Sequence, residues 1–177
     1  MSTDQTAGLS RERADLLEAL GVHRHFLTFT TNGLTDEQAR QRTTVSELTL
    51  GGLIKHVSEV EESWADFIVN GPGSTQKDFG DMTEEDFAAR SAGFQLQPDE
   101  TLAGVLAEYQ RVAAATDALV AVVDLDLTHP LPTAPWYEPG ARRSARRSLL
   151  HIIAETAQHA GHADIIREAL DGAKTMG

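Results

Sequence analysis

Apolar residues recur three or four positions apart along four segments of the chain, a spacing that places them on one face of a helix. This periodicity predicts helices over residues 10–31, from 46 or 50 to 69, from 98 to 120, and from 144 to 171. Helices with one apolar face bury these faces against each other, and four of them form a four-helix bundle. We therefore expect an all-α fold in a single domain over residues 1–177.

The connections between these segments carry weaker signals. Residues 34–37 and 83–90 contain a threonine followed by acidic residues, which predicts short capped turns of helix. The rest of 71–98 is expected to be a long loop, and such loops are typical of functional or mobile segments. Residues 124–140 contain four prolines and break the regular pattern. Almost no segment alternates apolar and polar residues as a strand would.

Composition and charge exclude several classes of protein. The formal net charge of −12 repels phosphate backbones and anionic lipids, so we expect neither nucleic acid nor a membrane as partner. Residues 1–10 are polar and lack an apolar run of signal-peptide length, so we expect a cytoplasmic protein. The chain contains no cysteine. Any metal must therefore be held by nitrogen and oxygen, and any thiol chemistry needs a thiol from outside.

Two residues of the last predicted helix bear chemistry on its apolar face. Glu155 and His159 are four positions apart, so they lie about 40° apart around the helix axis and one turn from each other. A charged carboxylate in a bundle interior costs several kcal/mol unless it is paired or binds a metal. One interpretation is a hydrogen-bonded Glu–His pair in a wet interior, and the other is a metal site.

A third candidate ligand lies on the second predicted helix. His56 belongs to the apolar stripe of that helix, which also contains Leu53, Val57 and Val60. Such a histidine is often a hydrogen-bonded core residue. Inward-facing histidine and carboxylate side chains on different helices are also how bundles build metal centres. Two histidines and one carboxylate suit Zn²⁺ with an open coordination position, or Fe²⁺ and Ni²⁺. On the pattern alone both interpretations stay open.

The chain resembles the DinB-like family of four-helix metalloenzymes, which includes YfiT-type members and mycothiol- and bacillithiol-dependent enzymes. The resemblance covers nearly the whole chain and is strongest in three places. These are Leu-Thr-Leu-Gly-Gly-Leu-Ile-Lys-His-Val at 48–57 with Glu61 and Trp64, Ala-Pro-Trp at 134–136, and Glu-Thr-Ala-Gln-His-Ala-Gly-His-Ala-Asp-Ile-Ile-Arg-Glu at 155–168. It implies that His56, Glu155 and His159 bind a divalent metal.

Many relatives have three histidines at the metal, whereas this chain has Glu155 in place of the middle one. That variant resembles the mycothiol-dependent maleylpyruvate isomerase type, which carries a further domain that this shorter chain lacks. The resemblance therefore implies the single-domain mycothiol S-transferase branch. We expect a cytoplasmic enzyme of detoxification, in which zinc (or nickel or iron) activates mycothiol to attack a small electrophile.

Other functions use the same residues. A metal-dependent hydrolase would activate water for attack on an ester or amide. A structural metal would only tie two helices together, and a metal-free bundle would serve dimerisation. A homodimer is expected to form through an exposed helix face.

Further histidines of the last helix lie within about 40° of Glu155 around the axis. His162 is the candidate catalytic residue, as a fourth ligand, a proton shuttle or a residue that orients its neighbours, and we prefer the last role. His151 is expected to be a polar residue at the end of the bundle. Asp164 points away from Glu155 and is expected at the surface or paired with Arg167.

Two remaining features have two interpretations each. Arg142, Arg143, Arg146 and Arg147 are expected to open the last helix, either as a clamp for a substrate carboxylate or as a solvated face that balances an acidic protein. The Trp136-Tyr137 pair lines a pocket rim or anchors a loop. Trp64 is expected in the core.

Overall fold

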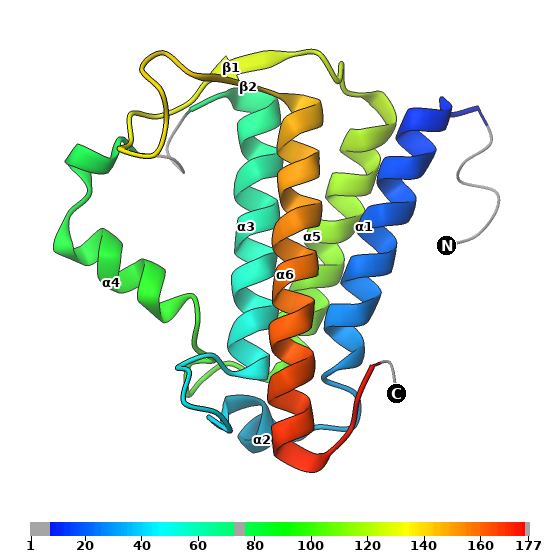
Figure 1. The fold of residues 1–177 in the computed structure, drawn as a ribbon, viewed down its shortest axis with the longest axis vertical. Coiled ribbons are helices and arrows are strands. Elements are labelled where there is room, and N and C mark those ends of the chain that lie inside the picture. Colours follow the sequence, from blue (N-terminus) through cyan, green and yellow to red (C-terminus); the bar gives the residue numbers. More distant parts are fainter. Residues whose placement is uncertain (1–7, 73–76, 176–177) are drawn as a thin grey trace.

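The computed structural model describes residues 8–72 and 77–175. Residues 73–76 of the long loop expected at 71–98, and most of the polar N-terminal stretch, lie outside the described residues. Four long helices lie side by side and form a bundle, which confirms the predicted all-α class (Figure 1). They are α1 (Arg11–Phe29), α3 (Leu50–Asn70), α5 (Leu102–Val122) and α6 (Ala145–Asp171).

The order of the helices around the bundle explains the long connection. α3 packs against α5 and α6, and α1 packs against the same two helices. α3 and α6 run in opposite directions, whereas α3 and α5 run in the same direction (Figure 1). The chain must therefore return along the bundle before α5 begins, and it carries η1 (Phe79–Asp81) and α4 (Glu84–Ala92) on the way. The packing of α3 on α6 brings the two helices with candidate ligands together.

Side-chain caps set where the helices begin. Thr49, Thr101 and Ser144 each accept a hydrogen bond from the backbone N–H three residues further on. α3 therefore begins at the later of its two expected positions, and α5 begins after residue 98. At the other end, Gly71 and Gly172 follow α3 and α6 with φ of 75° and 80°, a region that favours glycine.

The two short helical turns expected from threonine and acidic residues are present. α2 (Asp36–Arg40) and α4 each begin with a capping box, in which a threonine and a side chain three residues later bind each other's backbone N–H groups. Both short helices therefore begin at threonines that mark them in the sequence.

A small antiparallel sheet was not expected from the sequence. β1 (Thr128–Pro130) pairs with β2 (Arg142–Ser144), with Thr128 opposite Ser144. The expectation that four arginines open the last helix is therefore wrong for Arg142 and Arg143, which lie in β2. Strands of three residues are too short for an alternating pattern to identify them.

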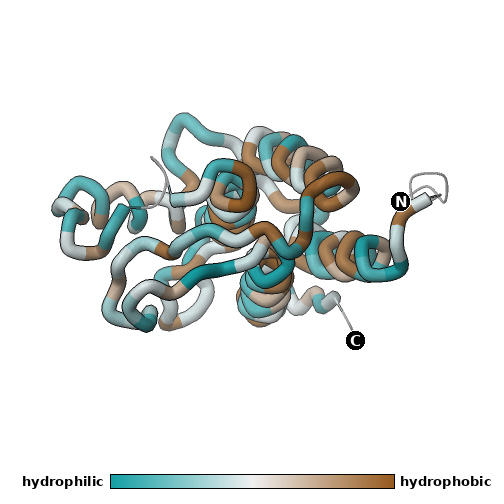
Figure 2. Tube along the Cα trace, turned by 90° about the horizontal axis from the view of Figure 1, so that it is seen from above, coloured by the Kyte–Doolittle hydropathy of each residue, from teal (hydrophilic) through white to brown (hydrophobic). Residues whose placement is uncertain are grey.

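The bundle core consists of two apolar clusters with a charged layer between them. Trp64 and Ile152 belong to one cluster, and Val57 and Ala160 belong to the other, so Trp64 is a core residue as predicted. Glu61 lies between them on α3 and is fully buried. Seen along the bundle, the apolar residues of the helices gather toward the interior (Figure 2). No helix within the described residues is long and apolar enough to span a membrane.

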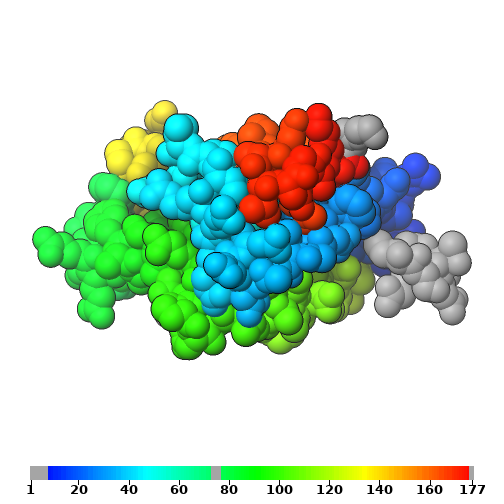
Figure 3. All heavy atoms as spheres, turned by 90° about the horizontal axis from the view of Figure 1, so that it is seen from below, coloured from blue at the N-terminus to red at the C-terminus, as the bar shows by residue number. Residues whose placement is uncertain are grey.

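The lower end of the bundle is closed by segments from both halves of the chain. The chain before α3 and the last turns of α6 lie against each other there (Figure 3). Arg167 donates to the backbone oxygens of Thr30 and Asn32, and the Thr43 hydroxyl donates to the backbone oxygen of Ile166. The Arg167 bonds fix α6 against the end of α1, and the Thr43 bond fixes it against the chain that leads to α3.

Candidate metal centre

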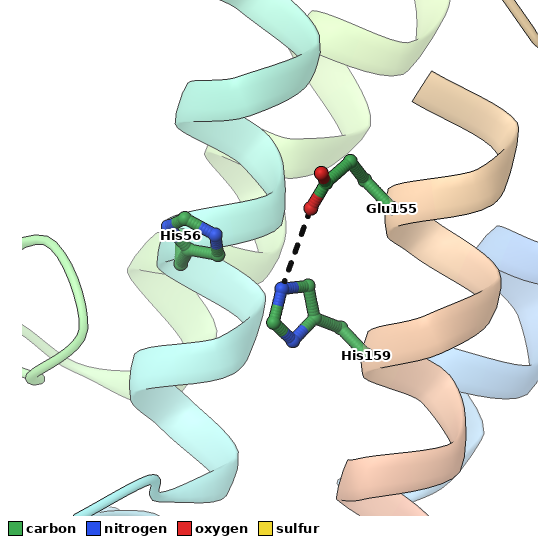
Figure 4. Close-up of side chains that lie close together, drawn as sticks. All are labelled: His56, Glu155 and His159. Carbon is green, nitrogen blue, oxygen red and sulfur yellow. Dashed lines mark ion pairs between the residues drawn. The ribbon is translucent and has the colours of Figure 1, made fainter. Parts of the chain in front are cut away.

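The three predicted ligands meet between α3 and α6. His56 lies on α3, and Glu155 and His159 project from successive turns of α6 toward α3 (Figure 4). One ligand atom from each side chain lies within 4.8 Å of the other two. The His56 and His159 rings meet edge to face, with their centroids 4.9 Å apart. The face of α3 that carries His56 therefore meets the face of α6 that carries Glu155 and His159, as the sequence indicated.

In the described part of the chain, the ion-pair partners of Glu155 are two histidines, which carry a charge only when protonated. Its carboxylate oxygens lie 3.6 Å from Nε2 of His159 and 3.5 Å from Nε2 of His151. The longer of these contacts is beyond hydrogen-bonding distance. Among the described residues, no lysine or arginine forms an ion pair with Glu155. These distances favour the metal interpretation over a hydrogen-bonded Glu–His pair.

His56 is held in place by the chain that follows α4. The Phe94 ring stacks on the His56 imidazole, with ring centroids 3.8 Å apart and planes 22° apart. Phe94 comes this close because Gly52, one turn before His56, has no side chain. A Cβ at Gly52 would overlap the backbone carbonyl of Phe94. The glycine therefore allows the contact that orients the ligand.

Burial keeps both candidate imidazoles uncharged. Burial lowers the pKa of His56 to about 4, and the charge of Arg90, together with that of His159 when it is protonated, acts in the same direction. Burial also lowers the pKa of His159, with a smaller contribution from His162. A neutral imidazole has the free lone pair that a metal needs. The donor set of two neutral nitrogens and one carboxylate thus fits a divalent cation such as zinc.

His162 lies beside the three candidate ligands but outside their group. Its Nδ1 is 3.4 Å from Nδ1 of His159, whereas Nε2 of His159 faces Glu155. His162 therefore contacts the His159 ring at the nitrogen that does not face Glu155. The placement agrees with the preferred role of orienting His159, and that role stays a prediction.

His151 lies closer to the candidate centre than the sequence predicted. It does not lie free at the bundle end, because it contacts Glu155 and the edge of the Trp64 ring, with ring centroids 5.0 Å apart. Burial lowers its pKa, against the charge of Glu155. Its position four residues before Glu155 is the sequence signal that could have identified it.

The arginine cluster does not act as one unit. Arg142 donates to Thr128 across the small sheet, and Arg146 forms ion pairs with Glu12 and Asp126. A clamp of four arginines is therefore wrong, because two of them are already bound within the protein. For Arg143 and Arg147, the described residues provide no ion pair.

The remaining expectations concern residues away from the centre. Asp164 does not pair with Arg167: it accepts from the backbone of Thr175, and Arg167 pairs with Asp171. The Trp136 ring meets Phe79 edge to face at 5.2 Å, which fits the loop-anchor interpretation.

Comparison with known proteins finds a family match. A family model described as Mycothiol-S-transferase matches residues 15–172, a range that contains all three candidate ligands. No curated protein matches the chain.

Proposed function

The chain belongs to the mycothiol S-transferase family, of the DinB-like fold, and on that premise we propose that it is a divalent-metal-dependent mycothiol S-transferase. His56, Glu155 and His159 would hold the metal. Zinc suits two histidines and one carboxylate with an open position, and nickel or iron accept the same donors. The co-substrates would be mycothiol and a small electrophile.

One observation carries the proposal. Three donor atoms from two antiparallel helices lie within 4.8 Å of one another, and the carboxylate among them has no cationic side chain as partner in the described part of the chain. A half-buried carboxylate without such a partner is costly, and a bound cation removes that cost.

When bound, the metal would supply a positive charge that lowers the pKa of a thiol toward neutrality. The chain's own residues have other tasks. Phe94 holds the His56 ring by stacking, and His162 contacts the His159 ring from the side away from Glu155. We propose that His151, which contacts Glu155 and whose pKa is lowered by burial, accepts the proton of the thiol.

In the transfer itself, the thiolate sulfur would attack the electrophilic carbon. A carbon–sulfur bond forms, and the leaving group departs with the electrons of its bond. The thiol proton passes to a base and then to solvent. Because the chain contains no cysteine, the electrophile cannot alkylate a thiol of the protein itself.

The geometry also bears on the structural-metal alternative. Structural zinc sites are closed by four protein ligands. Within the described residues, only three side chains join the group, and His162 contacts His159 rather than the space between the ligands. A three-donor centre leaves a position for a substrate.

The test combines metal content with turnover. Protein loaded with zinc, nickel or iron is assayed with mycothiol and chlorodinitrobenzene, and separately with an ester panel without thiol. We expect thiol-dependent product and one metal per chain. His56→Ala should lose most of the metal and the turnover, whereas His25→Ala, on exposed α1 surface, should retain both. Ester turnover without thiol would favour the hydrolase instead, and full metal content in His56→Ala would contradict the proposed ligands.

A further inference from the structure

Arg143 is set apart from its neighbours by where β2 directs it. Successive side chains of a strand point to opposite faces. Arg142 is exposed and bonds to Thr128, whereas Arg143 is partly buried and lies over two aromatic rings. Its guanidinium carbon is 4.4 Å from the centroid of Trp64 and 5.6 Å from that of Tyr137. The two rings hold the guanidinium plane in one orientation.

One nitrogen of this guanidinium is buried without a hydrogen-bond partner. Nη1 of Arg143 has no acceptor among the described residues. Burial lowers the pKa of Arg143, and the hydroxyl of Tyr137 acts against that effect. A buried charged donor without an acceptor is costly. Although the protein has 27 acidic residues, none in the described part of the chain forms an ion pair with Arg143, and the Arg143 side chain is partly exposed.

A short series of contacts joins Arg143 to the candidate metal centre. Arg143 lies over Trp64, the Trp64 ring contacts His151, and His151 contacts Glu155. The charges of Arg143 and Arg147 also act on the His151 imidazole, which places both near it. The side chains of His151 and Glu155 are 27% and 28% exposed, so a small molecule has access to this edge of the centre.

From these contacts we propose that Arg143 binds a carboxylate of the electrophilic co-substrate, so that the enzyme selects anionic electrophiles. This inference rests on the proposed transferase function. A guanidinium presents two parallel N–H donors to a carboxylate, and such bonds are stronger than those between neutral groups. The carboxylate takes no part in the reaction and holds the electrophilic carbon near the metal ligands.

The class of electrophile is represented by chlorodinitrobenzoate. The thiolate sulfur forms a bond to the carbon that bears chlorine, the carbon–chlorine bond breaks, and chloride leaves with its electron pair. The thiol proton passes to solvent, and the carboxylate stays unchanged. Chlorodinitrobenzene undergoes the same reaction without a carboxylate, so the two compounds differ only in the group that Arg143 would bind.

Binding is measured first, without any reaction. Dinitrobenzoate and neutral dinitrobenzene, which lack the leaving group, are titrated into the full chain in a calorimeter. We expect Arg143→Gln to weaken dinitrobenzoate binding by about tenfold, the loss of a hydrogen-bonded charge pair, and to leave dinitrobenzene unchanged. Arg142→Gln removes the same charge from the exposed face of the same strand and should change neither.

Arg143→Lys gives a second measurement if the glutamine variant does not fold. It retains the charge, loses the paired donors and should bind dinitrobenzoate less tightly than the unmodified chain. Unchanged dinitrobenzoate binding in the folded Arg143 variants overturns the proposal. So does an equal loss in Arg142→Gln, which would indicate a general effect of charge.

Turnover then separates this inference from the proposed function. With mycothiol, Arg143→Gln should raise KM for chlorodinitrobenzoate and leave KM for chlorodinitrobenzene unchanged. Loss of the Arg143 charge beside His151 should change kcat for the two compounds equally. Transfer with equal KM for both compounds in the unmodified chain would overturn the inference and leave the function intact. Absence of transfer, combined with the expected binding pattern, would overturn the function and leave the anion site intact.

Discussion

The His56 and His159 imidazoles lie close together, His56 partly buried and His159 buried, and their protonation therefore affects folding. In the unfolded chain His56 has its ordinary pKa of 6.5, whereas burial lowers that pKa to about 4 in the folded protein. Between these two values the unfolded state binds more protons than the folded state. The free energy of unfolding must then fall as the pH falls through this window.

We therefore expect the metal-free protein to lose stability between about pH 6.5 and pH 4, in part because of His56. His56→Gln, which cannot be protonated, should show a shallower decline over the same window. Urea unfolding at several pH values measures this. Equal pH dependence for the two proteins would mean that His56 is not shielded as its burial implies.

At the level of single residues, the charge of Glu155 and the neutrality of both histidines act together. Metal binding needs deprotonated imidazoles. Since the pKa values of His56 and His159 are lowered, protons compete less with a cation here than at exposed histidines. Burial of the two histidines therefore has two effects. It favours binding of a cation, and it lowers the stability of the metal-free protein in acid.

At the level of elements, the contact between α3 and the chain after α4 decides how His56 is oriented. Phe94 stacks on His56, and its backbone occupies the space that a side chain at position 52 would need. Two glycines thus occupy the first turn of α3, although glycine weakens a helix interior. The close approach of the Phe94 backbone explains why a glycine is required at position 52.

Gly52→Ala should consequently displace Phe94, lower stability by about 1–3 kcal/mol through overpacking, and weaken metal binding. Gly161→Ala on α6 is the matched control, because a Cβ there meets nothing within 4 Å. The control should gain about 0.5–1 kcal/mol from helix propensity. Thermal unfolding and metal titration measure both effects. Unchanged metal affinity in folded Gly52→Ala would show that Phe94 does not orient His56.

At the level of the whole molecule, a charged layer crosses the bundle next to the candidate centre. Arg24 of α1 bonds to the fully buried Glu61 of α3, with Nε 3.1 Å from the carboxylate, and also pairs with Asp117 of α5 at 2.7 Å. This layer connects three of the four long helices. Buried charges are stable only when they are paired, so each partner depends on the others.

Removal of one residue of this charged layer should therefore lower the free energy of unfolding strongly. We expect Glu61→Ala to lower the free energy of unfolding by about 3–5 kcal/mol, because it removes the fully buried partner of Arg24 and leaves only the partly exposed Asp117 to balance its charge. Glu62→Ala removes an exposed partner of Arg111 one position further on and should cost at most about 1 kcal/mol. Urea denaturation distinguishes the two. Similar losses in both variants would mean that the layer is not essential to the fold.

The spacing of apolar residues and the capping residues determined the helices, and residue spacing also determined part of the candidate metal site. Helical periodicity and capping threonines act over a few residues, so the four long helices and two short ones were predicted from neighbouring positions. The same local rule placed Glu155 and His159 on one face of one helix, because their spacing is one turn. The apolar stripe of the second helix added His56 as a candidate, and the family resemblance favoured the metal interpretation of all three residues.

Only the tertiary structure decided which faces meet and which charges remain unpaired. Packing of α3 on α6 brings His56 within ligand distance of α6, and it places His151 against Glu155. The three-residue strand β2 turns Arg143 toward Trp64 and Arg142 toward solvent. These outcomes depend on contacts between residues far apart in the chain, and periodicity within one helix contains no information on them.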